Sequence, residues 1–367
     1  MKSIMTKFQN MKKTTKSNLI TYSIVIIAYI IISIFSSLGL LSSLMQGLLV
    51  PICTYAIMAV SLNLTVGILG ELSLGHAGFM CIGAFASAFF TKCTADVITW
   101  TPVRFIIAII IGALAAALFG FLVGIPVLRL KGDYLAIVTL AFGEIIKNII
   151  NALYIGKDSN GFHFSMESFM DLGMEADGVM IINGPQGITG TSKDSSFTIG
   201  IILLLITFFI VLNLVNSRSG RAIMSIRDNA IAAESVGINL TKYKLMAFTI
   251  SASLAGVAGV LYAHNLSTLV ASPKNFGYNM SIMILVYVVL GGIGNMRGSM
   301  FAAVLLYVLP ELLRGLADYR MLIYAIVLIV VMIFNWNPTC REFRKKLSLS
   351  KLLSKVLKKK NNAKEVN

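Results

Sequence analysis

Charged residues are scarce in this chain, and long apolar runs take their place. Of its 367 residues, 13% are charged and 57% are hydrophobic, whereas an ordinary soluble domain has about 25% charged residues. The mean hydropathy is +0.83. This composition excludes a soluble globular domain and predicts a polytopic integral membrane protein with an all-α fold.

Cysteine and histidine are also sparse, and neither is arranged as a set of metal ligands. The four cysteines, at positions 53, 81, 93 and 340, show no paired spacing, and the three histidines, at positions 76, 163 and 264, are scattered. Neither a zinc site nor a disulfide framework is indicated. We therefore expect no metal site.

Nucleotide-binding motifs are missing as well. The Gly156-Lys157 pair is followed by Asp158 and lacks the upstream glycine of a P-loop. The segment from Gly292 to Gly294 does not extend to a dinucleotide-binding fingerprint, because Arg297 stands where the third glycine belongs. The sequence predicts no catalytic residue, no ATP hydrolysis and no cofactor held by this chain.

Basic residues explain the net charge of +15, and they sit in blocks beside the apolar runs. Five lysines and no acid lie within residues 1–18, and ten basic residues face one acid, Glu342, between positions 341 and 364. Such blocks mark cytoplasmic ends rather than a nucleic-acid-binding surface. We expect basic cytoplasmic segments at 1–18 and 337–367, the second either solvated or lying on anionic lipid.

Residues 19–336 contain ten apolar runs, which predict a transmembrane region of about ten membrane-spanning helices. We expect both ends of the chain to lie in the cytoplasm. The runs cover residues 19–38, 44–69, 79–91, 105–128, 134–154, 197–215, 245–270, 280–292, 300–316 and 321–334. With the N-terminus inside, residues 156–196 fall outside and residues 217–244 fall inside.

The charges of these two polar segments agree with their predicted sides. Residues 156–196 carry six acids and two lysines, whereas residues 217–244 carry Arg218, Arg221 and Arg227. Arginine is costly in hydrocarbon, so the second segment is in water. We expect an external loop, which is a small cap or docking platform rather than a plain connection, and a cytoplasmic loop.

Local signals in the cytoplasmic loop predict a short helix. Asp228 or Asn229 can cap its first turn, residues 230–236 can form about two turns, and Gly237 can end it in the left-handed conformation.

The predicted short helix has the composition of a docking element. Ala232 and Ala233 leave one side flat, as suits insertion into a groove of another protein, and Glu234 and Arg227 can fix its orientation by charge. An ordinary solvated connector is the alternative.

Two glycine-rich stretches interrupt the helical pattern. The first contains Gly67, Gly70 and Gly75, and the second contains Gly291, Gly292 and Gly294. Interrupted helices often line the substrate path of transporters, because freed backbone groups can face water or ligand. Tight turns at the ends of spans are the alternative.

Acids within or beside the apolar runs are few, at positions 71, 144, 311 and 318. Glu144 has Lys147 one turn away to neutralise it. An ionisable pair in a span suggests contact with a zwitterionic solute. The alternative is that this ion pair only fixes how the helices pack.

Several blocks of sequence occur in the order typical of one transporter family. They are SLNL at 61–64, LSLGHAGF at 72–79, KGDYLAIVTLAFGEI at 131–145, NGPQGI at 183–188, SGRA at 219–222, VGIN at 236–239 and LGGIG at 290–294. Over about residues 50–335 the chain resembles the LivM-type permeases of branched-chain amino-acid ABC importers. In ABC importers a loop of the form Glu-Ala-Ala-x-x-x-Gly docks on the ATPase, and residues 231–237 fit it with Ile231 in place of the glutamate.

This resemblance implies half of a translocation pore in a prokaryotic cell membrane. It implies two cytoplasmic ABC ATPase subunits that bind ATP and Mg²⁺, a homologous second permease, and an extracytoplasmic amino-acid-binding protein. We assign ATPase coupling to Arg221, Arg227, Asp228, Ala232, Ala233, Glu234 and Gly237, and the substrate path to Asn63, Ser73, Thr139, Glu144 and Asn183.

Other functions stay open from the sequence. A permease for urea or short-chain amides would share the architecture. An ion-coupled secondary transporter would need carboxylates at mid-membrane. A membrane scaffold would use the spans only for packing.

Overall fold

The structure is a computed structural model, and it describes residues 13–95, 97–130, 132–158, 161–167, 170–174 and 178–313, with scattered positions between 319 and 333. The tail at 337–367, residues 1–12 and six of the fourteen residues of the expected span at 321–334 lie outside the described residues. The chain divides into two units, Met1–Val308 and Leu309–Asn367, and nearly all described elements belong to the first.

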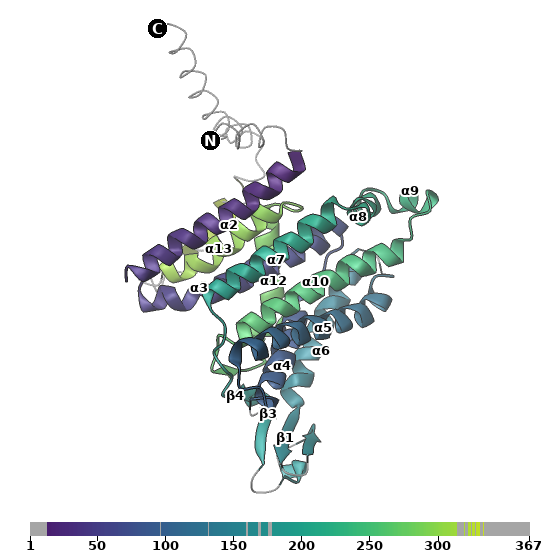
Figure 1. Cartoon of the computed structure of the whole chain (residues 1–367). Helices are drawn as coiled ribbons and strands as arrows, with labels where there is room; N and C mark the ends of the chain where they lie inside the picture. Colours follow the sequence, from purple (N-terminus) through teal and green to yellow (C-terminus); the bar gives the residue numbers. More distant parts are fainter. Residues whose placement is uncertain are drawn as a thin grey trace, which may run out of the picture. The chain divides into compact units, whose positions relative to one another are not determined.

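Apolar helices make up most of the first unit (Figure 1). The helices are α2 (Lys13–Ser37), α3 (Ser43–Asn63), the π-helix η1 (Leu64–Leu69), α4 (His76–Cys93), α5 (Thr101–Val127), α6 (Asp133–Ala152), α7 (Phe197–Asn216), α8 (Arg218–Asp228), α9 (Ala230–Ser235), α10 (Leu240–Ala263), α11 (Pro273–Phe276), α12 (Tyr278–Gly291) and α13 (Met296–Leu312). Two short 3-10 helices are η2 (Met170–Leu172) and η3 (Gly184–Gln186).

Six of the described helical segments are long and apolar enough to cross a membrane. They are Asn18–Ser37, Ser43–Leu69, Thr101–Val127, Asp133–Ala152, Phe197–Asn216 and Leu240–Ala263. The expected runs at 79–91, 280–292 and 300–316 form α4, α12 and α13, of 18, 14 and 17 residues, which are not among these six.

The centre of the unit is built on α10, which packs against α3, α4 and α5. Close packing needs small residues: a Cβ on Gly83 of α4 would lie 2.5 Å from Cα of Gly256 on α10. On α5, by contrast, Ile106, Ile110 and Leu114 are each more than half exposed. Their four-residue spacing places them in one apolar stripe, which suits contact with lipid.

A small β-structure corrects the all-α prediction. The strands β1 (Tyr154–Asp158), β2 (Gly161–Ser165) and β3 (Val179–Asn183) form an antiparallel sheet in the order β2-β1-β3, and β4 (Ile188–Thr189) pairs with β5 (Thr268–Leu269). Phe162 and Phe164 alternate along β2, a pattern that favours strand over helix. The polar insert is therefore a folded platform and not a loop.

The short helix α9 and the strands lie at opposite ends of the first unit (Figure 1). The helix α10 begins five residues after α9 and ends five residues before β5. Its 24 residues span about 36 Å at 1.5 Å per residue. A membrane-length helix therefore separates the two ends.

Candidate functional site

The loop between α7 and α10 folds as two capped helices. Ser217 Oγ accepts a hydrogen bond from Gly220 N at 3.1 Å at the start of α8, and Asn229 Oδ1 accepts from Ala232 N at 3.0 Å at the start of α9. Gly237 has φ of +86° and follows the last turn. Asn229, and not Asp228, is therefore the cap, and the predicted left-handed end is confirmed.

Exposure along α9 differs from the predicted flat face. Ala233 is buried at 4% exposure against the rest of the protein, so only Ala232 of the two alanines is exposed. Glu234 is exposed, and Ile231 and Val236 present 82% and 75% of their surfaces. Two large apolar side chains on a small water-facing helix indicate a surface that a partner covers.

Arg227 points back into the molecule and reaches the first glycine break. Its Nη1 donates to the carbonyl oxygen of Gly67 at 3.0 Å, and its Nη2 lies 2.8 Å from Asp228 Oδ1. A Cβ on Gly70, whose φ is +82°, would lie 2.5 Å from Arg227 Cγ. Arg227 thus makes a contact inside the chain, and its part in orienting α9 by charge stays a prediction. Arg221 is exposed, and Arg227 itself keeps 37% of its side chain exposed.

A second contact joins the same two regions. Lys244, near the start of α10, forms an ion pair with Glu71, which follows the first break. Both side chains are mostly buried, at 15% and 16% exposure. The segment that carries α8 and α9 is therefore anchored to the first break at two points.

The two glycine breaks, distant in sequence, lie against each other. Asn63 is fully buried; its Oδ1 accepts from Gly294 N at 2.8 Å and its Nδ2 donates to Ser299 Oγ at 2.7 Å. A Cβ on Gly67 would lie 2.7 Å from Gly294 Cα. Asn63 thus links η1 to the turn between α12 and α13, and its amide is not accessible to a solute in this conformation.

The remaining predicted glycines also permit close approach of backbone. A Cβ on Gly75 would lie 2.9 Å from the carbonyl carbon of Thr139. Gly291 packs against Gly298, which was not among the predicted glycines, and a Cβ on Gly298 would lie 2.9 Å from the carbonyl carbon of Gly291. Gly292 and Gly294 have positive φ of +96° and +81°. These glycines are required by geometry, whatever their part in transport.

Thr139 and Ser73 lie where α6 meets the segment after the first break. Thr139 Oγ1 accepts from Leu74 N at 3.0 Å and donates to Ala136 O at 3.0 Å. Ser73 Oγ is buried and has no hydrogen-bond partner among the described residues. Of the predicted path residues, Ser73 is thus the one whose polar group has no partner among the described residues, although it is as buried as Asn63.

Glu144 is tied to two other groups. Its Oε2 pairs with Lys147 on the same helix, and its Oε1 accepts from Tyr278 N, the first residue of α12, at 2.7 Å. Lys147 is 8% exposed and Glu144 25%. The carboxylate therefore joins α6 to the start of α12, a packing role.

Asn183 lies apart from these residues. It belongs to β3, and its Nδ2 donates to Gln186 Oε1 at 2.8 Å. The structure therefore brings Asn63, Thr139 and Ser73 to the glycine breaks but places Asn183 on the sheet.

Other members of this region could not be identified from the sequence patterns. Ser299 and Lys244 carry no local signal, and Glu71 differs from other acids only in following a glycine break. Buried His76 bonds to Ser61 Oγ through Nε2 at 2.7 Å, and this contact was also missed.

Comparison with known proteins gives a family match over most of the chain. A profile described as branched-chain amino acid transport system / permease component matches residues 44–334. No solved structure matches.

Two curated relatives share the name high-affinity branched-chain amino acid transport system permease protein LivM, from Salmonella typhimurium and Escherichia coli. Each is 35% identical over 294 residues, 77% of this chain and 66% of the relative, so the chain spans just under two thirds of their length. A permease protein LivH of Escherichia coli is 24% identical over 290 residues, 76% of this chain and 89% of that protein.

Proposed function

The chain belongs to the family of branched-chain amino acid transport system permease components, and from this we propose that it forms half of the pore of an ATP-driven importer for leucine, isoleucine and valine. The relatives named LivM and LivH support the solute class. A urea or short-chain amide permease of the same architecture is the neighbouring alternative, since an external binding protein would make much of the selection.

The geometry of α9 is the observation that carries this proposal. It is a capped helix with exposed Ile231 and Val236, and it is anchored to the transmembrane helices through the regions on either side. A cytoplasmic ATPase of the ABC class is the partner that such a loop would take in this family.

The contacts suggest how ATPase movement would reach the pore. Displacement of α9 moves α8, and Arg227 passes this to the carbonyl of Gly67. Asn63 then couples η1 to Gly294, so both glycine breaks shift together. Solute and ATP states would favour different arrangements of these helices, as coupling requires.

The proposed assembly contains two ATPase subunits, which hold ATP and Mg²⁺, a homologous second permease and an extracytoplasmic amino-acid-binding protein. This chain would hold no cofactor. We propose about ten spans in a prokaryotic cell membrane, with both ends and residues 217–244 in the cytoplasm and the sheet outside.

Affinity purification of the tagged chain from native membranes, followed by mass spectrometry, tests the proposal. We expect two ABC ATPases and a sister permease to come with it. A chain that purifies alone and still transports solute without ATP would contradict it, and would favour an ion-coupled transporter.

A further inference from the structure

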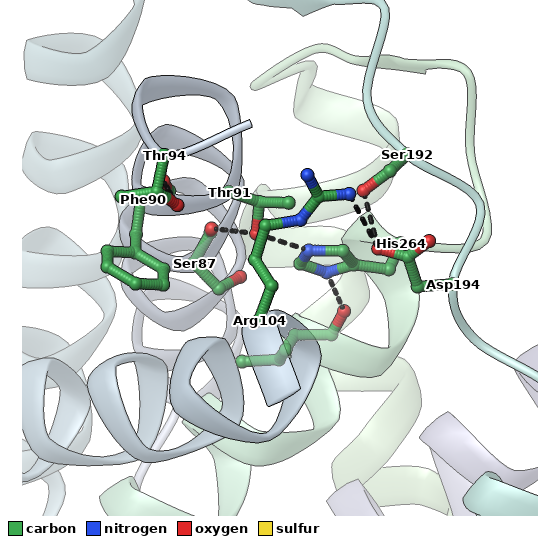
Figure 2. A network of polar contacts seen from close by, with 9 residues as sticks. Ser87, Phe90, Thr91, Thr94, Arg104, Ser192, Asp194 and His264 are labelled. Carbon is green, nitrogen blue, oxygen red and sulfur yellow. Dashed lines mark hydrogen bonds and ion pairs between the residues drawn. The ribbon is translucent and has the colours of Figure 1, made fainter. Parts of the chain in front are cut away.

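A polar cavity lies at the end of the bundle opposite α9, away from the glycine breaks. Its volume is about 80 Å³, which exceeds the 10–15 Å³ that one water molecule requires. Its lining includes Lys92 at the end of α4, Arg104 near the start of α5, and His264 directly after α10. Figure 2 shows Arg104 and His264 meeting the loop that carries Ser192 and Asp194.

The guanidinium of Arg104 has one buried nitrogen, Nε, that lacks a hydrogen-bond partner among the described residues. The side chain as a whole is 11% exposed. The one ion pair is with Asp194, at 3.9 Å from Nη2 to Oδ2, which is too long for a hydrogen bond. Because a buried donor without an acceptor is costly, the N–H at Nε favours a ligand that can accept from it.

The neighbouring polar groups leave the cavity with one positive charge in excess. Asp194 accepts a hydrogen bond from Ser192 Oγ at 2.6 Å and offsets one of the two cations. Lys92 Nζ donates to the carbonyl oxygens of Met180 at 2.6 Å and Thr189 at 3.1 Å, which leaves one of its three N–H groups.

His264 adds no fixed charge. It is 1% exposed, and its burial lowers its pKa, so it is neutral at pH 7. Its Nδ1 lies 2.9 Å from the carbonyl oxygen of Val260, which can only accept, so Nδ1 carries the proton. Its Nε2 lies 2.9 Å from Thr91 Oγ1, whose hydroxyl donates to the carbonyl oxygen of Ser87 at 2.8 Å.

The wall of the cavity is held in place by backbone contacts. Gly190 N and Thr191 N donate to Ser267 O at 3.0 and 3.2 Å, and Ser195 N donates to His264 O at 3.3 Å. The cavity is therefore formed before any ligand arrives, as is usual for small-molecule sites.

We propose that this cavity binds a carboxylate group, with Arg104 as its main ligand, and that the carboxylate is that of the amino acid on its way into the pore. Arginine pairs with carboxylates through two parallel hydrogen bonds, and one excess positive charge matches one carboxylate. The identity of the solute rests on the proposed function, which places this end of α10 outside.

Saturation-transfer NMR of the full chain in nanodiscs, with its co-purified subunits and without ATP, tests the site. Acetate is the probe and acetamide its neutral counterpart. We expect a signal from acetate only, with affinity lowered about tenfold or more by Arg104→Gln, the loss expected for a charge-assisted hydrogen bond. Arg129→Gln, an exposed arginine just beyond the other end of α5, is the matched control and should change nothing.

A second variant keeps the test decisive if Arg104→Gln does not fold. Asp194→Asn removes the competing carboxylate at constant size, and we expect it to tighten acetate binding. Equal signals from acetate and acetamide, or acetate binding that both variants leave unchanged, would overturn the site.

The solute is tested separately by competition. Leucine should displace acetate, and leucinamide, which lacks the carboxylate, should not. Displacement by neither would overturn the assignment to this solute and count against the proposed function, while acetate binding at Arg104 would be unaffected.

Discussion

At the scale of single residues, Arg227 holds the central position. Its guanidinium bonds the carbonyl of Gly67 and the carboxylate of Asp228, and its aliphatic stem packs on Gly70. An arginine that the sequence places on a docking surface thus also holds a helix break in place. Together with the Lys244–Glu71 ion pair, this side chain connects the α8–α9 segment to the first glycine break.

We expect Arg227→Gln to separate ATP hydrolysis from transport. Loss of a charge-assisted hydrogen bond costs about 1.5–3 kcal/mol, so movement of α8 would no longer be transmitted reliably to η1. Solute uptake per ATP hydrolysed, measured in proteoliposomes, should fall severalfold while the subunits remain assembled. Arg218→Gln, an exposed arginine at the start of the same helix, is the control. Unchanged coupling in Arg227→Gln would refute the transmission role.

Asn63 and Ser299 should act as a unit. Removing either breaks the hydrogen bond between the two side chains, and the loss of the bond from Gly294 N is common to the single and double Asn63 variants. The effects of the two substitutions should therefore not add. In a double-mutant cycle of Asn63→Ala and Ser299→Ala, followed by denaturation in mixed micelles, we expect an interaction free energy of about 0.5–1.5 kcal/mol. Additive effects would show that the hydrogen bond contributes little to holding the two breaks together.

At the scale of elements, α9 shows which features local chemistry determines. Its start at Asn229 and its end at Gly237 follow from capping residues and were predicted. The contact between Gly67 and Gly294 could not be predicted from the sequence, because it depends on how α3 and α12 pack. The sheet at 154–183 was not predicted, because its strands of five residues are too short to form a membrane-length apolar run.

The terminal glycine of α9 gives a prediction with a close control. Gly237→Val should uncouple ATPase activity from uptake, because a β-branched residue at φ of +86° is strained by about 1–3 kcal/mol and would distort the helix end. Gly39→Val carries similar strain at φ of +69°, also in open space, in the turn between α2 and α3. Equal loss of uptake in both variants would point to strain alone and not to docking.

The exposed Ile231 tests how α9 docks. In place of the glutamate of the family pattern this chain has an apolar side chain, and burying it in a partner contributes about 1.5–3 kcal/mol. Ile231→Asp should therefore weaken ATPase binding at least tenfold, measured by co-purification at graded concentrations. Val97→Asp, a comparably exposed position at the other end of the unit, should have no effect. Full retention of the ATPase by Ile231→Asp would exclude an apolar docking face.

At the scale of the whole molecule, two polar regions stand at the ends of a membrane-length helix. One end carries α9 and its anchors, and the other carries the sheet and the cavity around Arg104 (Figures 1 and 2). The glycine breaks join α3, α12 and α13, and Arg227 joins them to the α9 end. The proposed importer would use one of these regions to contact its ATPase and the other to admit solute.

Uptake of labelled leucine by proteoliposomes that contain the purified complex tests the ATP-driven importer most directly. We expect uptake only when ATP is inside, where the ATPases face, and the binding protein is outside, with no response to a proton or sodium gradient. Uptake that follows an ion gradient and continues without ATP would contradict the importer.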